Sequence, residues 1–333
     1  MPGHADPGQE PASLASTVST HIAYIAGSAR SGSTLLERIL DRVPGFCAVG
    51  ETVFIWERGL RRNDRCGCGE RFHDCPFWTE VGMKAFGGWD RVDVGEATAL
   101  RRAVDRHRHL LRLAARGHEG PLGTALRSYR ALTGRLYEGV REVSGADVIV
   151  DSSKHVGYAL VLRDTPGIDL RLIHMIRRSH GVAHSWTKRV IKPGVGDGEY
   201  MSVHGTSWTI GLWLADNVLF DLVSRGMPGA ARIRYESLIA DPASEVRRVL
   251  GELALASADL SMSFLSDSSA ELPASHALSG NPMRFQSGKI TLRADEEWRE
   301  AMSGPRKAAI SAATWPLLRR YGYPVSTRRL SSS

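Results

Sequence analysis

Short apolar runs alternate with stretches of helical periodicity along most of the chain. The first run, 22–26, is followed by a turn of small residues and then by apolar positions at helical spacing from 33 to 41. Similar strand-then-helix patterns occur at 147–162, 170–185 and 231–240. This alternation predicts parallel strands joined by right-handed helical crossovers. We therefore expect an α/β fold, in which a central parallel sheet is built around the first run and has helices on both faces.

The other patterned regions extend this prediction. The apolar run 46–49 follows the first helix, and we expect it to be the strand next to 22–26. Helical periodicity with many basic side chains predicts a helical cap insertion over about 90–145. The remaining regions predict helices at 207–222 and 298–321, a serine-rich loop at 259–278 and a glycine-rich acceptor lid at 192–206.

The two ends of the chain differ in composition from its interior. Residues 1–20 and 326–333 lack apolar periodicity, and we expect a disordered leader and a disordered tail around one domain at 21–325. No stretch of 18 apolar residues occurs, so no membrane span is expected. The leader has no basic region followed by an apolar one, which favours a cytoplasmic protein.

Composition adds a constraint on partners. The chain has 333 residues, of which 42% are hydrophobic, enough to bury a sizeable core. Its formal net charge of +7 admits anionic partners. The basic residues are spread along the chain without a run of five, so the charge does not indicate nucleic acid. A polyanionic nucleotide is a sufficient explanation.

The turn at 27–32, Gly-Ser-Ala-Arg-Ser-Gly, lies between the first strand and the first helix. Such a turn directs consecutive backbone N–H groups and the positive end of the helix dipole toward one point, which suits a phosphate or sulfate oxygen. Its spacing is that of a Walker A loop, but Ser33 stands where an NTPase or kinase needs lysine. Arg30 supplies a positive charge inside the loop. A sulfuryl group carries one negative charge, which an arginine and hydrogen bonds can hold.

These residues resemble the 5′-phosphosulfate loop of sulfotransferases that use 3′-phosphoadenosine 5′-phosphosulfate. In that family a basic residue, then Ser-Gly, then Ser/Thr-Thr opens the first helix. The resemblance implies a P-loop-like fold and a loop that holds the 5′-phosphosulfate through the following residues: Ser28, Arg30, Ser31, Gly32, Ser33 and Thr34.

A second anion site is predicted further along the chain. Arg177 ends a predicted strand and Ser185 follows eight positions later, a spacing that lets both reach one anion. Sulfotransferases use such a pair to hold the 3′-phosphate of the cofactor, and their Tyr-Glu-Asp-Leu tyrosine, here Tyr235, contacts the adenine. Arg284 resembles the late basic residue that covers the 3′-phosphate, and Lys289 and His276 are weaker matches for it.

Two residues compete for the role of general base. Glu51 follows a predicted strand, so its side chain is expected at the ligand edge of the sheet. In tyrosylprotein sulfotransferases the glutamate of a similar Leu-Asp…Pro…Glu-Thr segment is the base, although the arginine they carry next is Val53 here. Cytosolic sulfotransferases use a histidine two residues after a lysine, whereas His155 follows Lys154 directly. The resemblance implies Glu51 as the base and His155 as its rival, with Lys154 and Arg30 stabilising charge on the transferred group.

Four cysteines occur, three of them within ten residues. Cys66, Cys68, His73 and Cys75 could supply four metal ligands, but their first pair is C-x-C and not the C-x2-C of a standard zinc knuckle. Without a secretion signal, thiols or a metal clip are favoured over disulfides. We expect a reduced, packed loop without a metal.

The resemblance as a whole implies a bacterial sulfotransferase. It would transfer a sulfuryl group from 3′-phosphoadenosine 5′-phosphosulfate to a hydroxyl or amine of a small-molecule or carbohydrate acceptor, with no metal required. Two other functions fit the residues: a metal-dependent P-loop kinase, which the missing lysine disfavours, and a non-catalytic nucleotide-binding protein. The sequence determines neither the acceptor nor the oligomeric state.

Overall fold

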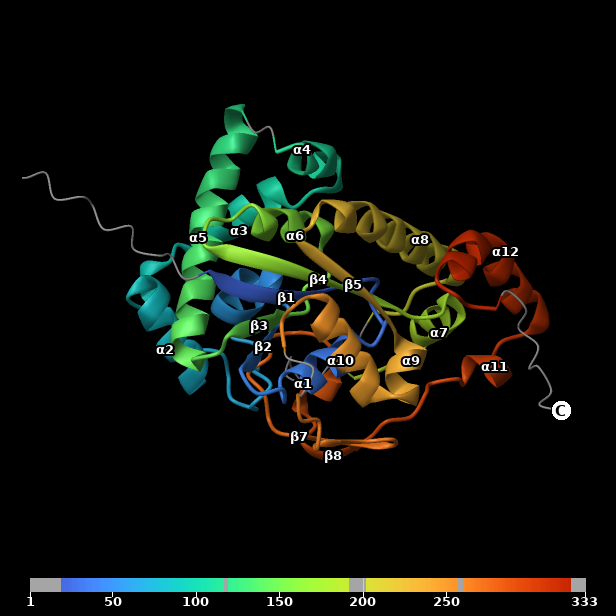
Figure 1. Cartoon of the computed structure of the whole chain (residues 1–333). Coiled ribbons are helices and arrows are strands. Elements are labelled where there is room, and N and C mark those ends of the chain that lie inside the picture. The colour runs from blue at the N-terminus through green and yellow to red at the C-terminus, as the bar shows by residue number, and fades with distance from the viewer. Residues whose placement is uncertain (1–18, 117–118, 192–199, 201, 257–259, 325–333) are drawn as a thin grey trace, which may run out of the picture.

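Five parallel strands form the central sheet, in the order β2-β3-β1-β4-β5 (Figure 1). The computed structural model describes residues 19–116, 119–191, 200, 202–256 and 260–324. The predicted α/β fold is confirmed, because the apolar runs singled out in the sequence share this one sheet. Its strands are β1 Thr20–Ala26, β2 Phe46–Gly50, β3 Val148–Asp151, β4 Ile168–Ile176 and β5 Gly229–Arg234.

The prediction that the second strand lies next to the first is wrong. β3 separates them, since Ile149 pairs with Ile22 on one side and with Cys47 on the other. All four residues of β3 are buried, whereas Phe46 and Cys47 at the start of β2 are partly exposed. A strand that is apolar on both faces suits an inner position, and the less apolar β2 forms the edge.

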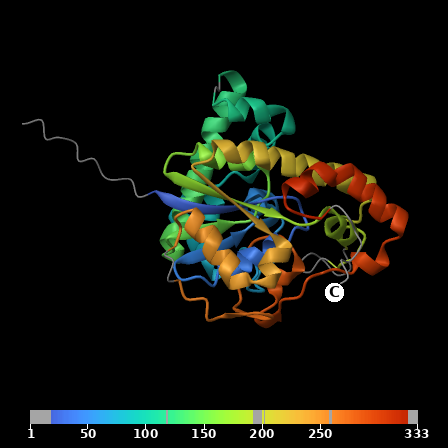
Figure 2. The same ribbon diagram turned by 45° about the vertical axis from the view of Figure 1, so that its right-hand side comes forward.

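Alternate residues of β1 enter two separate cores. Ile22 and Tyr24 pack with helices on one face, and Ala23 and Ile25 pack with helices on the other. Figures 1 and 2 show the helices on the two sides of the sheet. The first face is covered by α5 Gly120–Ser144, α6 Val156–Arg163 and α8 Thr206–Val223, and the second by α1 Ser33–Leu40, α9 Tyr235–Ala240 and α10 Pro242–Glu252.

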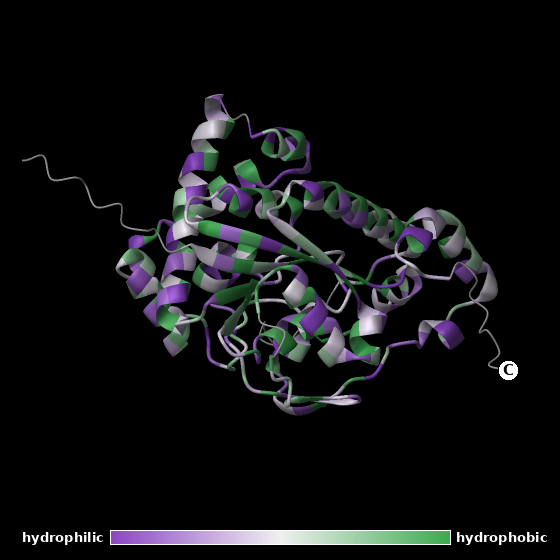
Figure 3. Cartoon of the chain, in the orientation of Figure 1, coloured by the Kyte–Doolittle hydropathy of each residue, from purple (hydrophilic) through white to green (hydrophobic). Residues whose placement is uncertain are grey.

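The region expected as a helical cap is helical. Its longest helix, α5, alternates between hydrophobic and hydrophilic positions along its length (Figure 3). Leu136 and Tyr137 of α5 are buried in the first core, so this helix also covers the sheet. The other helices of the cap are α3 Val94–Val104 and α4 Leu110–Ala114. Before the cap come α2 Pro76–Phe86 and the helical segments Thr52–Phe54 and Ile55–Arg61.

No helix within the described residues is long and apolar enough to cross a membrane.

The serine-rich stretch expected as a loop contains strands. β6 Leu265–Ser266, β7 Ser269–Leu272 and β8 Gly288–Thr291 form a small antiparallel sheet. Ala270 and Leu272 are buried in the second core, and Glu271 between them is exposed. The strands have only two to four residues, which is too short for the alternation to be recognised in the sequence.

The helix expected at 298–321 is two helices, α11 Trp298–Ala301 and α12 Gly304–Arg320. Met302 is extended at the break, and Pro305 lies in the first turn of α12, where its fixed φ and missing N–H are tolerated. α7 Ser179–Ser185 follows β4. The predicted tail, most of the predicted lid and residues 1–18 of the predicted leader lie outside the described residues, and Thr20, expected in the leader, begins β1.

Candidate active site

The carboxyl ends of all five parallel strands border a cleft of about 430 Å³. Parallel α/β sheets bind their ligands at this edge. Most of the site residues predicted from the sequence line the cleft: Arg30, Gly32, Ser33, Thr34, Glu51, Lys154, Arg177, Ser185 and Tyr235. Segments far apart in the sequence therefore converge on one place.

The turn between β1 and α1 adopts a conformation that its glycines make possible. Gly27 has φ +131°, and a Cβ there would lie 2.2 Å from the carbonyl oxygen of Met175. Gly32 has φ +96°, and a Cβ there would lie 2.6 Å from the ring of Tyr235. The chain then enters α1 at Ser33, so the first N–H groups of this helix have no intrahelical carbonyl to bind. Those N–H groups, at the positive end of the helix dipole, suit an anion.

Two buried polar atoms of the turn also lack a partner. The Oγ of Ser31 and the Nη2 of Arg30 are buried and make no hydrogen bond within the described part of the chain. Buried polar groups are nearly always paired in folded proteins. Arg30, which lines the cleft, therefore has an unused hydrogen-bond donor for an incoming ligand.

Arg177 extends from the end of β4 toward the same turn. Its Nη1 donates to the carbonyl of Arg30 at 3.2 Å, and its Nη2 lies 3.1 Å from the Oδ2 of Asp295. Its guanidinium lies 4.5 Å from the ring centre of Tyr235. Burial and the like charge of Arg177 together lower the pKa of Arg30. An anion between the two guanidinium groups would relieve their repulsion. Ser185, the last residue of α7, lines the cleft as well.

Three predicted cofactor ligands lie outside the lining of the cleft. Ser28 and Ser31 are buried within the turn. Arg284 is also buried, and its guanidinium donates to the carbonyls of Gly280 at 3.1 Å and Arg65 at 3.4 Å. Arg284 thereby links the loop that contains Arg65 to the loop that contains Gly280, and Gly280 lines the cleft.

Glu51, at the end of β2, forms an ion pair with Lys154 beyond the end of β3. The Nζ of Lys154 lies 2.7 Å from the Oε1 of Glu51, and Ser279 donates to the Oε2 at 2.9 Å. The Nη1 of Arg58 lies 3.7 Å from the same Oε2. Burial by itself raises the pKa of Glu51, but the charge and hydrogen bond of Lys154, with Arg58 and Ser279, outweigh burial and lower that pKa. The side chain is therefore a carboxylate at neutral pH.

The carboxylate lies close to the start of α1. Gly280 lies next to both. A Cβ placed on Gly280 would be 3.6 Å from the Oγ1 of Thr34, in the first turn of α1, and 3.9 Å from the Oε1 of Glu51. A group bound at the helix N-terminus would therefore have the carboxylate of Glu51 beside it.

His155 faces a different environment. Its Nδ1 lies 2.8 Å from the Oδ2 of Asp105, and its ring packs edge-on against Phe54. The hydroxyl of Tyr24 bonds to its backbone at 2.9 Å. His155 is not among the residues that line the cleft, whereas Lys154 is. In cytosolic sulfotransferases the histidine lies two residues after the lysine. Here it follows Lys154 directly, and its imidazole lies outside the lining of the cleft.

Sequence reasoning missed several residues that line the cleft. Arg58 approaches Glu51 from the helical segment that follows it, although the arginine expected at position 53 is absent. The ring of Trp186 lies 5.2 Å from the guanidinium of Arg30. Asn281 and Arg293 also line the cleft. No local motif marks these residues, because they come from segments that meet only in the folded chain.

Comparisons with known proteins identify the family of the chain. Residues 23–259 match the sulfotransferase family. Among solved structures, the sulfotransferase domain of the Synechococcus PCC 7002 olefin synthase is 18% identical, with 96% of this chain and 99% of that chain aligned at a TM-score of 0.49. A sulfotransferase from Mycobacterium tuberculosis H37Rv is 13% identical over 73% of this chain and 69% of that chain, with a TM-score of 0.40. No curated protein matches.

The family match covers well over half of the chain and includes every strand of the central sheet beyond the first residues of β1. Within it lie the turn before α1, the pair Glu51 and Lys154, and Arg177. The arginine-lined cleft is thus the candidate active site, and the chain belongs to the sulfotransferase family.

Proposed function

We propose that the enzyme transfers a sulfuryl group from 3′-phosphoadenosine 5′-phosphosulfate to a hydroxyl or amine of a small-molecule or carbohydrate acceptor. One observation carries this proposal: two arginines and the N-terminus of α1 converge on a cleft that also holds a buried carboxylate paired with a lysine. The cations suit a donor with several negative charges. The carboxylate suits removal of a proton from an acceptor.

The donor would bind along the cationic side of the cleft. Arg30 and the N–H groups of 31–34 would hold the 5′-phosphosulfate, and Arg177 with Ser185 would hold the 3′-phosphate. Two observations support this division: the Nη2 of Arg30 is a buried donor that has no partner among the described residues, and Arg177 lies beside the ring of Tyr235, which would contact the adenine.

In the proposed transfer step, the bonds formed and broken balance, and no metal is needed. The acceptor oxygen forms a bond to sulfur while the bond from sulfur to the bridging phosphate oxygen breaks, and that electron pair leaves with 3′,5′-diphosphoadenosine. The acceptor proton moves to Glu51. Each oxygen of this carboxylate accepts one hydrogen bond from Lys154 or Ser279, and a carboxylate has about four lone-pair sites, so room remains for the acceptor. Once Glu51 is protonated, the charge of Lys154 is free to stabilise the leaving oxygen.

The position of Glu51 favours it over His155 as the base. Glu51 lines the cleft beside the start of α1, whereas His155 is bound to Asp105 outside the lining. A base must come within hydrogen-bond reach of the proton that it removes.

Isothermal titration calorimetry with 3′,5′-diphosphoadenosine tests the donor assignment. We expect binding at least tenfold tighter than that of AMP, because AMP lacks the 3′-phosphate. A charge-assisted hydrogen bond contributes about 1.5–3 kcal/mol, so Arg177→Ala should weaken binding about tenfold or more. Lys188 lies 3.2 Å from Asp295 and would still neutralise it in this variant.

Arg248→Ala is the matched control, since Arg248 pairs with Glu245 and Glu252 on the surface and is absent from the cleft lining. Equal affinity for AMP and the diphosphate, or an unchanged affinity in Arg177→Ala, would refute the donor assignment. Magnesium-dependent turnover of ATP would support the kinase alternative instead.

A further inference from the structure

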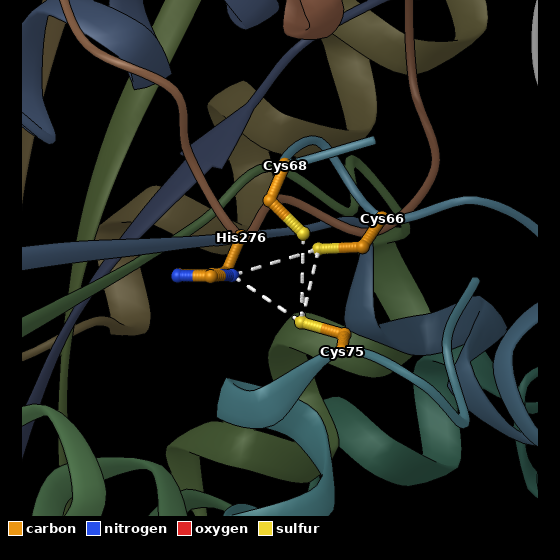
Figure 4. A group of neighbouring side chains, drawn as sticks. All are labelled: Cys66, Cys68, Cys75 and His276. Atoms are coloured by element: carbon orange, nitrogen blue, oxygen red, sulfur yellow. Dashed lines mark hydrogen bonds between the residues drawn. The ribbon is translucent and has the colours of Figure 1, made fainter. Parts of the chain in front are cut away.

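Three cysteine thiols and one imidazole meet next to the cleft, from segments about 200 positions apart. The Sγ atoms of Cys66, Cys68 and Cys75 and the Nδ1 of His276 all lie within 4.8 Å of one another (Figure 4). The sequence suggested His73 as the fourth member of this group, and the structure corrects that. The Nε2 of His73 lies 3.0 Å from the carbonyl of Leu60, and His276 arrives from a distant loop.

Four of the six distances between these atoms lie close to those of a tetrahedral metal site. Zinc bonds of about 2.3 Å to sulfur and 2.0–2.1 Å to nitrogen place two sulfurs about 3.8 Å apart, and a sulfur and a nitrogen about 3.6 Å apart. The Sγ of Cys75 lies 3.7 Å from the Sγ atoms of both Cys66 and Cys68. The Nδ1 of His276 lies 3.3 Å from Cys75 and 3.8 Å from Cys66. A disulfide needs about 2.05 Å between its sulfurs.

The surrounding chain holds the four side chains in place. A Cβ at Gly67 would lie 2.7 Å from the carbonyl oxygen of Ser275, so a glycine between the first two cysteines lets the two loops approach. The N–H of Gly67 donates to the carbonyl of Ala277 at 3.0 Å. The ring of Phe77 stacks on the imidazole at 4.8 Å, and Trp78 donates to the carbonyl of His276 at 3.0 Å. The imidazole is thus oriented with its Nδ1 toward the thiols.

We propose that Cys66, Cys68, Cys75 and His276 form a structural zinc site. Four protein ligands complete a tetrahedron and leave no open position for substrate, which is the arrangement of structural rather than catalytic zinc. Thiolate sulfur and imidazole nitrogen are the ligands that zinc prefers, and calcium or magnesium would need oxygen.

The proposed zinc site would hold in place the loop after His276, which contacts Glu51. Two residues beyond His276, the N–H of Leu278 donates to Val49 at 2.9 Å, and its carbonyl accepts from the N–H of Glu51 at 2.7 Å. Ser279 then donates to the carboxylate of Glu51. Zinc would therefore join the cysteine loop to the edge of β2 and fix the position of Ser279. This inference does not depend on which donor or acceptor the enzyme uses.

Metal analysis of the full-length protein, expressed with zinc and purified under reducing conditions, tests the proposal. We expect about one zinc ion per chain. Cys66→Ser and His276→Ala should lose most of it. Two matched controls should keep it: Cys47→Ser, whose thiol lies outside the cluster, and His73→Ala, which removes the alternative histidine.

Reconstitution of the wild-type protein keeps the test independent of whether the variants fold. After removal of metal with a chelator, added cobalt(II) should give thiolate-to-cobalt charge-transfer absorption, and added zinc should displace it and restore the Tm lost on chelation. Absence of zinc from the purified protein together with failure to bind cobalt would overturn the proposal. So would a disulfide between two of the three cysteines, detected as a mass loss in the reduced preparation, or zinc loss in His73→Ala with zinc retained in His276→Ala.

Discussion

Glu51 shows how a buried carboxylate can stay ionised inside the cleft. Burial opposes its charge, but Lys154 at 2.7 Å and Ser279 at 2.9 Å stabilise the charged form. The sequence predicted the place of Glu51 because it directly follows a strand of a parallel sheet. It did not predict Ser279 or Arg58, since no spacing rule links a strand end to a residue more than 200 positions later or to the next helical segment.

The lowered pKa of Glu51 has a consequence for the pH dependence of catalysis. A base acts in its deprotonated form, and a lowered pKa keeps that form present as the pH falls. The acid limb of kcat/KM should therefore lie below about pH 4.3, the ordinary value for glutamate. A steady-state pH profile measures this limb. A limb near about pH 6.5, the ordinary value for histidine, would point to His155 instead.

Substitution of the base separates chemistry from binding. Glu51→Gln keeps the shape of the side chain but cannot take the acceptor proton, so kcat should fall about 10²- to 10⁴-fold. The affinity for 3′,5′-diphosphoadenosine should change little, because the arginines on the other side of the cleft are unaltered. His155→Ala is the control and should keep most of the activity. The assignment fails if Glu51→Gln stays active while His155→Ala does not.

At the scale of elements, long periodic segments were predictable and short or non-local ones were not. The first helix and the helix after β3 match their predicted bounds within a residue or two. The order of the strands was predicted less well, because pairing of β2 with β3 depends on a strand about 100 residues later in the chain. Strands β6 to β8 escaped detection because an apolar alternation of two residues is too short to recognise.

The contact between β2 and the loop at Leu278 can be tested through Gly50. Gly50 has φ +82°, and a Cβ there would lie 2.2 Å from the carbonyl oxygen of Leu278. Gly50→Ala should displace this loop, and we expect a loss of about 2–5 kcal/mol from backbone strain and broken hydrogen bonds. Denaturant unfolding measures the stability. A lower kcat should accompany it, because Ser279 moves away from Glu51.

Gly145→Ala provides the matched control for that substitution. Gly145 also has positive φ, +64°, but a Cβ there meets no atom within 4 Å. Only backbone strain of about 1–2 kcal/mol should result, with kcat unchanged. If both variants lose the same stability and keep the same kcat, Leu278 does not hold Glu51 as described.

At the scale of the whole molecule, short motifs predicted the residues of the proposed donor side of the cleft, whereas no motif indicated an acceptor side. Those motifs lie at strand ends, and the structure brings Arg30, Arg177 and Tyr235 to one edge of the sheet. The predicted acceptor lid falls mostly outside the described residues. The cysteine loop was predicted as metal-free, but its fourth partner, His276, lies about 200 residues away and could not be assigned from spacing.

Sulfuryl transfer requires both the proposed donor site and the proposed base. Mass spectrometry of the reaction products therefore tests this function most directly. The protein would be incubated with 3′-phosphoadenosine 5′-phosphosulfate and a library of hydroxyl and amine compounds, without added metal. We predict a sulfated acceptor together with an equal amount of 3′,5′-diphosphoadenosine, and loss of both in Glu51→Gln. Binding of the donor with no sulfated product from any acceptor class, or a phosphorylated product formed only with ATP and magnesium, would contradict the account.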